Sequence, residues 1–100
     1  MDVVLVTGGF DPLHSGHIEY FKEAKKLGDV LVVGVNSDEW LTRKKGRPFM
    51  KFKDRLAIIE SLEMVDDVIS FEDKDDTANH AIFKLMCTSA NRANIIFANG

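Results

Sequence analysis

The sequence predicts a three-layer α/β/α fold, in which helices cover both faces of a parallel sheet. Segments typical of strands and of helices alternate along the 100 residues, which is the pattern of α/β proteins. The strand-like runs at residues 3–7 and 30–35 are almost continuously apolar, as in parallel sheets buried on both faces. Glycine or short polar residues follow both runs, at the sheet edge where α/β folds bind ligands.

The first half of the chain predicts a strand, a helix and a second strand. Residues 3–7 are β-branched and apolar, and Gly8 and Gly9 end the run. Residues 16–27 predict a helix that Gly28 caps at its C-terminus. The apolar side chains expected on the buried face of this helix are Ile18, Phe21, Ala24 and Leu27. Residues 30–35 predict the second buried strand.

The second half predicts the remaining elements of the same pattern. Residues 41–50 are polar and basic and contain Gly46 and Pro48, so we expect a loop. The pattern then predicts a helix over 52–62, a strand over 67–71, a solvated acidic turn over 72–76, a helix over 77–90 and a strand over 95–98. The side chains expected to face the core are Leu56, Ile59 and Leu62 in the first of these helices, and Ala78, Ile82, Leu85 and Met86 in the second, where Cys87 adds a small apolar residue.

Composition restricts the classes of function. The chain holds 13 basic and 16 acidic residues, a net charge of −3, which argues against a general nucleic-acid binder because such proteins carry a basic surplus. No apolar run approaches the roughly 18–20 residues that cross a bilayer, so we expect no membrane span. The single cysteine, Cys87, excludes an internal disulfide framework and fits a reducing cytosol, so we expect a cytoplasmic protein.

The most informative segment is the turn between the first strand and the first helix. Gly8 and Gly9 permit a tight turn and the close approach of a phosphate. The helix that begins near Gly16 offers backbone N–H groups and a dipole that favour an anion. His14 and His17, three positions apart in the entry turn, can hold phosphate oxygens as charge develops. The segment therefore predicts a phosphate site.

Other interpretations of this segment account for fewer of its residues. The chain lacks both the Gly-x-x-x-x-Gly-Lys-Ser/Thr loop and the Gly-x-Gly-x-x-Gly fingerprint. His14 and His17 with Asp11 form a candidate metal site, but no second cluster supplies further ligands, so we assign no metal ligand to the protein. Two exposed histidines without a role would leave the concentration of glycine, histidine and Asp-Pro at one junction unexplained.

The same segment resembles the signature of a known family. Residues 8–17, Gly-Gly-Phe-Asp-Pro-Leu-His-Ser-Gly-His, look like the [Gly/Thr]-x-Phe-Asp-x-x-His-x-Gly-His motif of the cytidylyltransferase-like nucleotidyltransferases, which belong to the HIGH-motif α/β enzymes. In residues 24–29 and 35–38 the chain is similar to glycerol-3-phosphate cytidylyltransferases and to the adenylyltransferase domains that make ADP-heptose. The resemblance extends from Val3 to Gly100 and implies a Rossmann-like fold.

The resemblance also implies a reaction, nucleotidyl transfer. A phosphate on a small acceptor, of the glycerol phosphate or sugar phosphate class, attacks the α-phosphorus of CTP or ATP, and pyrophosphate leaves. His14 and His17 match the family histidines that contact the triphosphate and stabilise the transition state, and Lys44 falls where the family places a lysine on phosphate oxygens. Mg²⁺ is the expected cofactor, since it travels with triphosphates and offsets their charge.

Further residues have expected roles in binding or packing. The resemblance places four residues along the nucleotide cleft and the helix start: Gly8, Gly9, Phe10 and Gly16. Asp11 matches the motif aspartate and serves either the nucleotide or the order of its own loop. Arg55 matches a family arginine that either reaches the same phosphates or forms a structural ion pair. Trp40 is expected to pack on the core rather than line a base pocket, and His80 to lie on the surface.

A basic segment follows the second strand. Four cations lie within five consecutive residues of a net acidic chain: Arg43, Lys44, Lys45 and Arg47. Their position on the ligand side of the sheet favours phosphate binding over an ordinary solvated run of charge. Lys45 and Arg47 are therefore candidates, together with Asp38, for contacts with phosphate or with the acceptor.

The chain departs from the resembling enzymes at two places. It stops at Asn99 and Gly100, before the Ser/Thr-rich helix start that completes the nucleotide site in those enzymes, so we expect a single domain over residues 1–100 that is incomplete at its C-terminal end. Glu63 and residues 35–38 look like the adenylyltransferase domains that make ADP-heptose. Gly9 matches neither these domains nor the glycerol-3-phosphate cytidylyltransferases. CTP and ATP therefore both remain open as substrates.

Two further hypotheses compete with the enzyme. A non-catalytic nucleotide-binding module would keep the fold and bind a triphosphate without turnover, although the intact pair His14 and His17 argues against it. A class I aminoacyl-tRNA synthetase fragment shares the histidine signature, but its tRNA-binding parts need a far longer chain. By family analogy we also expect a homodimer.

Overall fold

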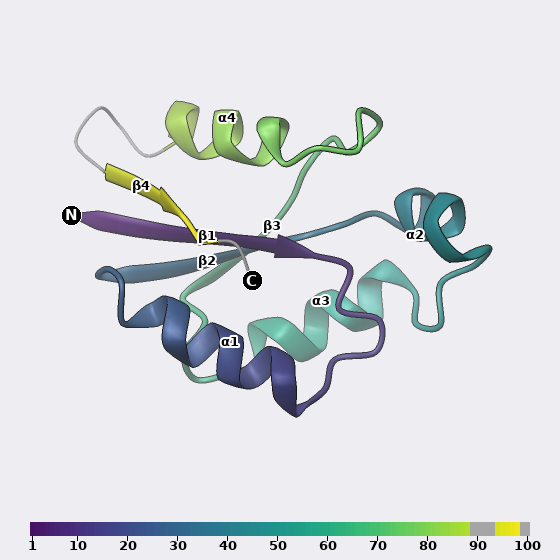
Figure 1. Cartoon of the computed structure of the whole chain (residues 1–100), viewed down its shortest axis with the longest axis horizontal. Coiled ribbons are helices and arrows are strands. Elements are labelled where there is room, and N and C mark those ends of the chain that lie inside the picture. The colour runs from purple at the N-terminus through teal and green to yellow at the C-terminus, as the bar shows by residue number, and fades with distance from the viewer. Residues whose placement is uncertain (89–93, 99–100) are drawn as a thin grey trace.

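The protein forms a parallel sheet flanked by helices. Figure 1 shows the computed structural model, which describes residues 1–88 and 94–98. Within these residues, four parallel strands form one sheet in the order β3-β2-β1-β4. The elements follow one another as β1 (Asp2–Gly8), α1 (Ser15–Lys25), β2 (Val30–Val35), α2 (Asp38–Lys45), α3 (Phe52–Glu60), β3 (Asp67–Ser70), α4 (Asn79–Thr88) and β4 (Asn94–Phe97). The predicted α/β fold with a parallel sheet is confirmed.

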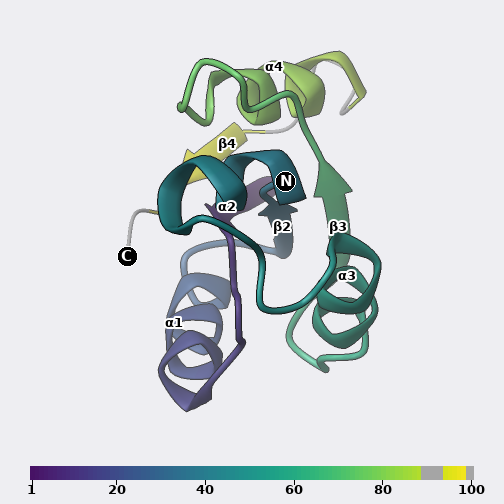
Figure 2. The ribbon, with the colours of Figure 1, turned by 90° about the vertical axis from the view of Figure 1, so that its right-hand side faces the viewer.

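The helices form layers on both sides of the sheet. Helices α1 and α3 cover one face and α4 covers the other. Helix α2 lies beyond the carboxyl ends of the strands, as Figure 2 shows in a view toward those ends. It therefore stands at the edge of the sheet where α/β folds bind ligands.

The core explains the apolar character of the central strands. Alternate side chains of β1 point to opposite faces, so that Val4 and Val6 pack toward α1 and α3 while Val3 and Leu5 pack toward α4. The helices add fully buried side chains to these clusters: Phe21, Ile59 and Ala81. In the described part of the chain, no helix has the length and apolar character needed to cross a membrane.

The register of the two central strands brings their following segments together. Gly8 at the end of β1 lies beside Val35 at the end of β2. The N–H of Asn36 donates a hydrogen bond to the carbonyl oxygen of Gly8 (2.9 Å). The turn that leads into α1 and the turn that leads into α2 therefore start side by side.

The prediction of a loop over residues 41–50 is wrong, because α2 extends to Lys45. Ser37 caps this helix by accepting a hydrogen bond from the N–H of Trp40 (3.1 Å), and acidic residues in the first turn and basic residues in the last complement its dipole. Gly46, with a φ of 93°, ends the helix in a conformation that favours glycine. Within α2, all of which the structure describes, Leu41 alone is buried. The sequence of α2 therefore has no apolar stripe from which a helix could be predicted.

The predicted end of the first helix is also corrected. Helix α1 ends at Lys25, and its C-cap is Lys26 rather than Gly28. Gly28 instead allows the backbone to pass close to Asp2, because a Cβ at this position would lie 2.8 Å from the carbonyl oxygen of Asp2. Leu27 therefore lies beyond the helix and is 54% exposed rather than buried.

The face that helix α4 turns to the sheet matches the predicted one only in part, since Leu85 is buried and Ile82 packs against the core as predicted. Ala81 and Leu85, one turn apart, are buried against the sheet. Met86 is 62% exposed and Cys87 is exposed, so neither contributes to the core. Residues 89 and 90 of the predicted helix lie outside the described residues.

Candidate active site

The turn between β1 and α1 is shaped around Phe10. This residue has a φ of 51°, and its ring packs edge-on against Phe21 and His17, with centroids 5.1 and 5.2 Å apart respectively. Gly8 leaves room for the ring, since a Cβ at Gly8 would lie 2.9 Å from it. The buried Phe10 ring thus fixes both the path of the turn and the place of the His17 imidazole.

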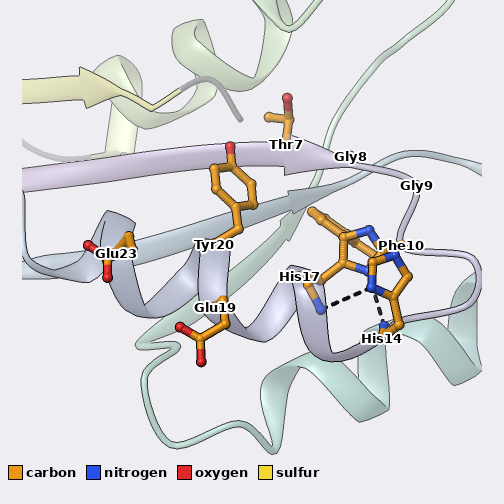
Figure 3. Close-up of a pocket in the computed structure, with 10 residues that line it drawn as sticks. Thr7, Gly8, Gly9, Phe10, His14, His17, Glu19, Tyr20 and Glu23 are labelled. Atoms are coloured by element: carbon orange, nitrogen blue, oxygen red, sulfur yellow. Dashed lines mark hydrogen bonds between the residues drawn. The ribbon is translucent and has the colours of Figure 1, made fainter.

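His14 and His17 cap the helix that follows. Nδ1 of His14 accepts a hydrogen bond from the N–H of Gly16 (3.0 Å), and Nδ1 of His17 accepts one from the N–H of His14 (3.1 Å). The two rings stack with centroids 3.9 Å apart, as Figure 3 shows. Because Nδ1 is the acceptor in both rings, each ring carries its proton on Nε2, which can donate to an anion at the helix start.

The surroundings of His17 keep its ring neutral. Burial lowers the pKa of His17 below its ordinary value of 6.5, and electrostatic repulsion from the adjacent His14 ring on protonation lowers it further. A neutral imidazole with a proton on Nε2 is still a hydrogen-bond donor. At neutral pH, His17 therefore meets an anion as a donor without a full charge.

This lowered pKa predicts a pH dependence of stability. The unfolded chain takes up a proton on His17 near pH 6.5, and the folded chain does so only at lower pH. The free energy of unfolding should therefore fall as the pH drops below about 6.5, and the group should add no slope above it. In an NMR titration the His17 ring should show a pKa below 6.5, and His17→Asn should flatten the slope. A pKa of 6.5 or higher would contradict the burial of the ring.

An open pocket of about 710 Å³ lies beside the two histidines, a volume in the range of ligand sites. Six of the residues predicted for the nucleotide site line it: Gly8, Gly9, Phe10, His14, Gly16 and His17. Helix α1 adds Glu19, Tyr20 and Glu23 to the lining (Figure 3). The hydroxyl of Tyr20 donates to the carbonyl oxygen of Ala98 (2.5 Å), which ties this helix to the end of β4. Asn99 and Gly100, where the sequence predicts the site to be incomplete, lie outside the described residues.

Asp11 orders the segment after α2. Its carboxylate is 1% exposed and accepts hydrogen bonds from the N–H groups of Phe49 (2.5 Å) and Met50 (2.6 Å). Lys45 pairs with the same carboxylate (2.7 Å) and donates to the Asp11 carbonyl oxygen (2.8 Å). Burial raises the pKa of Asp11, but Lys45 and the two N–H groups outweigh it and hold the pKa below its ordinary value. Of the two roles open to Asp11, the contacts support the ordering of the loop, and they engage Lys45 in the same task.

Arg55 makes the structural ion pair that was one of its two predicted roles. It is 1% exposed, and its guanidinium donates to the carbonyl oxygens of Gly9 (2.9 Å) and Asn36 (2.7 Å). It also donates to the carbonyl oxygen of Met50 (3.0 Å) and to the carboxylate of Asp38 (2.7 Å). Arg55 thus joins the residues that follow β1 and β2, and Asp38 is its ion-pair partner.

Two other basic candidates are exposed near the strand ends. Lys44 Nζ lies 5.5 Å from the centre of the half-buried Trp40 ring, a cation–π distance. Trp40 and Leu41 lie over Gly9, where a Cβ would come within 3.4 Å of Trp40 and 2.8 Å of Leu41. Arg47 is exposed just after the helix. Lys44 and Arg47 are both exposed and are not among the residues that line the pocket.

Asp73 is a buried residue that the sequence analysis missed. The sequence predicts a solvated turn over residues 72–76, yet Asp73 is 4% exposed and accepts hydrogen bonds from Asn36 and Ser37. Burial raises the pKa of Asp73, but these hydrogen bonds outweigh it, so the pKa lies below its ordinary value. The available signal was positional, since a carboxylate shortly after β3 reaches the same sheet edge as the residues after β2.

The two imidazole rings beside the pocket offer donors to an anion, and Glu19 and Glu23 add acidic groups to its lining. The structure contains, among its described residues, no group of three or more His, Cys, Asp or Glu side chains that could hold a metal ion. His80 is exposed on α4 as predicted, with its ring 3.7 Å from the Asp75 carboxylate. Imidazole Nε2–H groups at a helix N-terminus are instead the donors that bind phosphate oxygens.

Comparison with known proteins identifies the family. A sequence model described as cytidylyltransferase-like matches residues 5–96, a span that contains both histidines and the pocket. The chain belongs to the cytidylyltransferase-like family. The resemblance predicted from the sequence is thereby confirmed over residues 5–96.

Individual relatives agree with this assignment. The bifunctional protein HldE of Helicobacter pylori (strain HPAG1) is 49% identical over 73 residues, which cover 71% of the cytidylyltransferase-like chain and 16% of the relative. HldE of Haemophilus influenzae (strain PittGG) is 42% identical over 86 residues, 84% of this chain and 18% of the relative. The chain thus spans less than a fifth of these curated relatives.

A solved structure matches over nearly its whole length. The lipopolysaccharide core biosynthesis protein of Thermoplasma volcanium is 30% identical, with a TM-score of 0.73, and the match covers 99% of the cytidylyltransferase-like chain and 97% of that protein. A protein of unknown function from Archaeoglobus fulgidus, 20% identical with a TM-score of 0.61, shares the fold.

Proposed function

We propose that the chain forms the nucleotide site of a nucleotidyltransferase, which transfers a nucleoside monophosphate from ATP or CTP to a small phosphorylated acceptor. One observation carries the proposal. His14 and His17 each accept a hydrogen bond at Nδ1 and so keep a proton on Nε2, at a helix start beside an open pocket. Membership of the cytidylyltransferase-like family supports the same reaction.

The proposed reaction needs positioning and charge stabilisation from the protein. An oxygen of the acceptor phosphate bonds to the α-phosphorus, and the bond from that phosphorus to the oxygen bridging to the β-phosphorus breaks. Pyrophosphate leaves with the electron pair of the broken bond. The acceptor oxygen is already an anion at neutral pH, so no general base is required.

Named residues supply the two kinds of assistance. The Nε2–H groups of His14 and His17 donate to phosphate oxygens, on which charge grows in the transition state. The exposed ammonium of Lys44, on a flexible stem, binds the triphosphate and releases pyrophosphate. Mg²⁺ bound to the triphosphate would offset part of the charge on its phosphates.

ATP and a sugar phosphate form the first substrate pair to examine. Glu63 and residues 35–38 look like the adenylyltransferases that make ADP-heptose, and both curated relatives named above are HldE, whose adenylyltransferase domain is the ADP-heptose synthase part. CTP with glycerol phosphate is the second pair, because the motif of residues 8–17 is shared with the glycerol-3-phosphate enzymes.

Pyrophosphate release with mass detection of the products tests the proposal. The full chain is incubated with Mg²⁺ and each of ATP, CTP, GTP and UTP, paired with panels of sugar phosphates and polyol phosphates. The expected result is release, with a conjugate of matching mass, for ATP or CTP and one acceptor class. Triphosphate binding without release would support a non-catalytic nucleotide-binding module instead. If the chain shows no triphosphate binding and no pyrophosphate release, the assignment is overturned.

A further inference from the structure

We propose that Asp73 is a positioning residue, which fixes helix α2 and with it Lys44 beside the nucleotide site. The inference rests on the proposed function and deepens it. Asp73 touches no residue that lines the pocket in the contacts described above; it acts through the junction between β2 and α2. Contacts lead in three steps from the carboxylate to the junction between β2 and α2, from this junction to the helix, and from the helix to the pocket.

The first step is the direction of the Asp73 carboxylate. Oδ2 accepts hydrogen bonds from the backbone N–H of Ser37 (2.7 Å) and from the side-chain amide of Asn36 (3.1 Å). Oδ1 accepts one from the hydroxyl of Ser37 (2.8 Å). Both oxygens are therefore directed at the two residues that connect β2 to α2. A buried carboxylate that accepts from three donors holds these residues firmly, because hydrogen bonds to charged acceptors are stronger than those between neutral groups.

The second step runs from this junction to both ends of α2. Ser37 Oγ, which donates to Asp73, also accepts from the N–H of Trp40 (3.1 Å) and so caps the helix. In the last turn, Arg43 donates to the carbonyl oxygen of Asp73 (2.8 Å) and pairs with the carboxylate of Asp76 (3.0 Å). The segment from Asp73 to Asp76 thus holds α2 at its start and near its end.

The third step connects α2 to the pocket. Leu41 and Trp40 lie over Gly9, a residue that lines the pocket, and a Cβ on Gly9 would come within 2.8 Å of Leu41. Lys44 follows Trp40 by one helical turn, with its ammonium 5.5 Å from the centre of the indole ring. Any tilt of α2 would therefore move Lys44 relative to the pocket.

The helix depends on this tie because its own packing is slight. Within α2, a fully described helix of eight residues, Leu41 alone is buried. Helices of this length are unstable in water without tertiary contacts. Besides the ion pairs of Asp38 with Arg55 and of Lys45 with Asp11, the hydrogen bonds to Asp73 hold α2 in place, and losing them should loosen it.

Trp40, the single tryptophan of the chain, makes α2 directly observable. The test compares wild type with Asp73→Asn and with the control Asp66→Asn. Asp66 is a suitable control because its carboxylate also accepts a hydrogen bond from a β2 N–H, that of Leu31 (2.7 Å), and pairs with Lys25, far along the strand from α2. Hydrogen exchange of the Trp40 and Leu41 amides and Trp40 fluorescence anisotropy are measured without ligand.

The expected result in Asp73→Asn is faster amide exchange in α2, by about 10- to 100-fold, with lower Trp40 anisotropy. Asparagine keeps the size of the side chain but cannot accept at both ends. Asp66→Asn should leave the α2 amides and Trp40 as in wild type, even where it lowers overall stability. Unchanged α2 exchange in Asp73→Asn would overturn the proposal.

A second measurement connects the helix to the site. MgATP and MgCTP are titrated into each protein, and Asp73→Asn should raise the Kd of the bound nucleotide about tenfold, while Asp66→Asn stays within about twofold of wild type. A loosened α2 with unchanged affinity would overturn the positioning role. If wild type binds neither nucleotide, the proposed function fails, and with it the role of Asp73 at the site, whereas the exchange data still report whether Asp73 holds α2.

A further variant covers the case in which Asp73→Asn does not fold. Ser37→Ala removes the hydroxyl that links Asp73 to the Trp40 N–H and keeps the other two hydrogen bonds of the carboxylate. It should produce the same changes in α2 exchange and nucleotide affinity to a smaller extent. If the α2 amides of this variant exchanged at the wild-type rate, the result would contradict the proposal that Asp73 holds α2, as it would in Asp73→Asn.

Discussion

Replacing His14 with asparagine is expected to lower nucleotidyl transfer by about 10²–10³-fold without unfolding the protein, the effect of losing one preorganised donor to transition-state charge. Asparagine is among the best N-cap residues, so it can replace His14 Nδ1 as the acceptor for the Gly16 N–H. It cannot place a donor where the imidazole Nε2–H lies. Capping and phosphate contact, which the wild-type ring combines, are thereby separated.

The comparison requires turnover and stability to be measured together. The free energy of unfolding from denaturant titration should change by less than about 1 kcal/mol in His14→Asn. His80→Asn is the matched control, because His80 is exposed on α4 and lies outside the residues that line the pocket. If His14→Asn kept the wild-type turnover, His14 would be a helix cap with no part in the reaction.

Replacing Arg55 with methionine is expected to lower the free energy of unfolding by about 3–5 kcal/mol, since the change leaves buried partners without their donor. The guanidinium serves three carbonyl oxygens and one carboxylate, among them those of Gly9, Asn36 and Asp38. Methionine fills similar volume but satisfies none of them. Arg55→Lys should be nearly as damaging, because an ammonium lacks the planar fork that reaches both strand ends.

Denaturant titration of both variants, beside Arg47→Met, measures this effect. Arg47 is exposed, so its replacement should change the free energy of unfolding by no more than about 0.5 kcal/mol. A loss below 1 kcal/mol in Arg55→Met would contradict the bracing role. It would also favour the other predicted role of Arg55, a contact with phosphate.

Local sequence patterns were sufficient for the parts of the site that are local. His14 and His17 are three positions apart, so their neighbourhood on the first turn of α1 follows from helical geometry. The glycines at the end of β1 and directly after it, together with the apolar strands, likewise predicted the turn and the sheet. These features needed no knowledge of distant residues.

The features that sequence reasoning missed, as for Asp73, or left open between two roles, as for Asp11 and Arg55, depend on contacts across the chain. Asp73 meets Ser37 from 36 positions away, Asp11 meets Phe49 from 38, and Arg55 meets Gly9 from 46. No local pattern shows which carboxylate will be buried by such a partner.

Helix α2 was not predicted from the sequence, for a different reason. Its signals were local, namely the Ser37 cap, the acidic first turn and Gly46, but its residues are polar on nearly every side. An amphipathic pattern is a stronger indicator than caps, and here the pattern was absent. Tertiary hydrogen bonds, rather than an apolar face, hold the helix.

The central claim is that the Nε2–H groups of His14 and His17 meet the phosphates of a nucleoside triphosphate. Long-range ¹H–¹⁵N NMR of the histidine rings, with and without a non-hydrolysable Mg²⁺–triphosphate, tests it most directly. We predict the Nε2–H tautomer for both rings, and Nε2 shifts on addition of the ATP or CTP analogue that leave His80 unchanged. Rings protonated on Nδ1, or a nucleotide that binds without moving either Nε2 signal, would contradict this account.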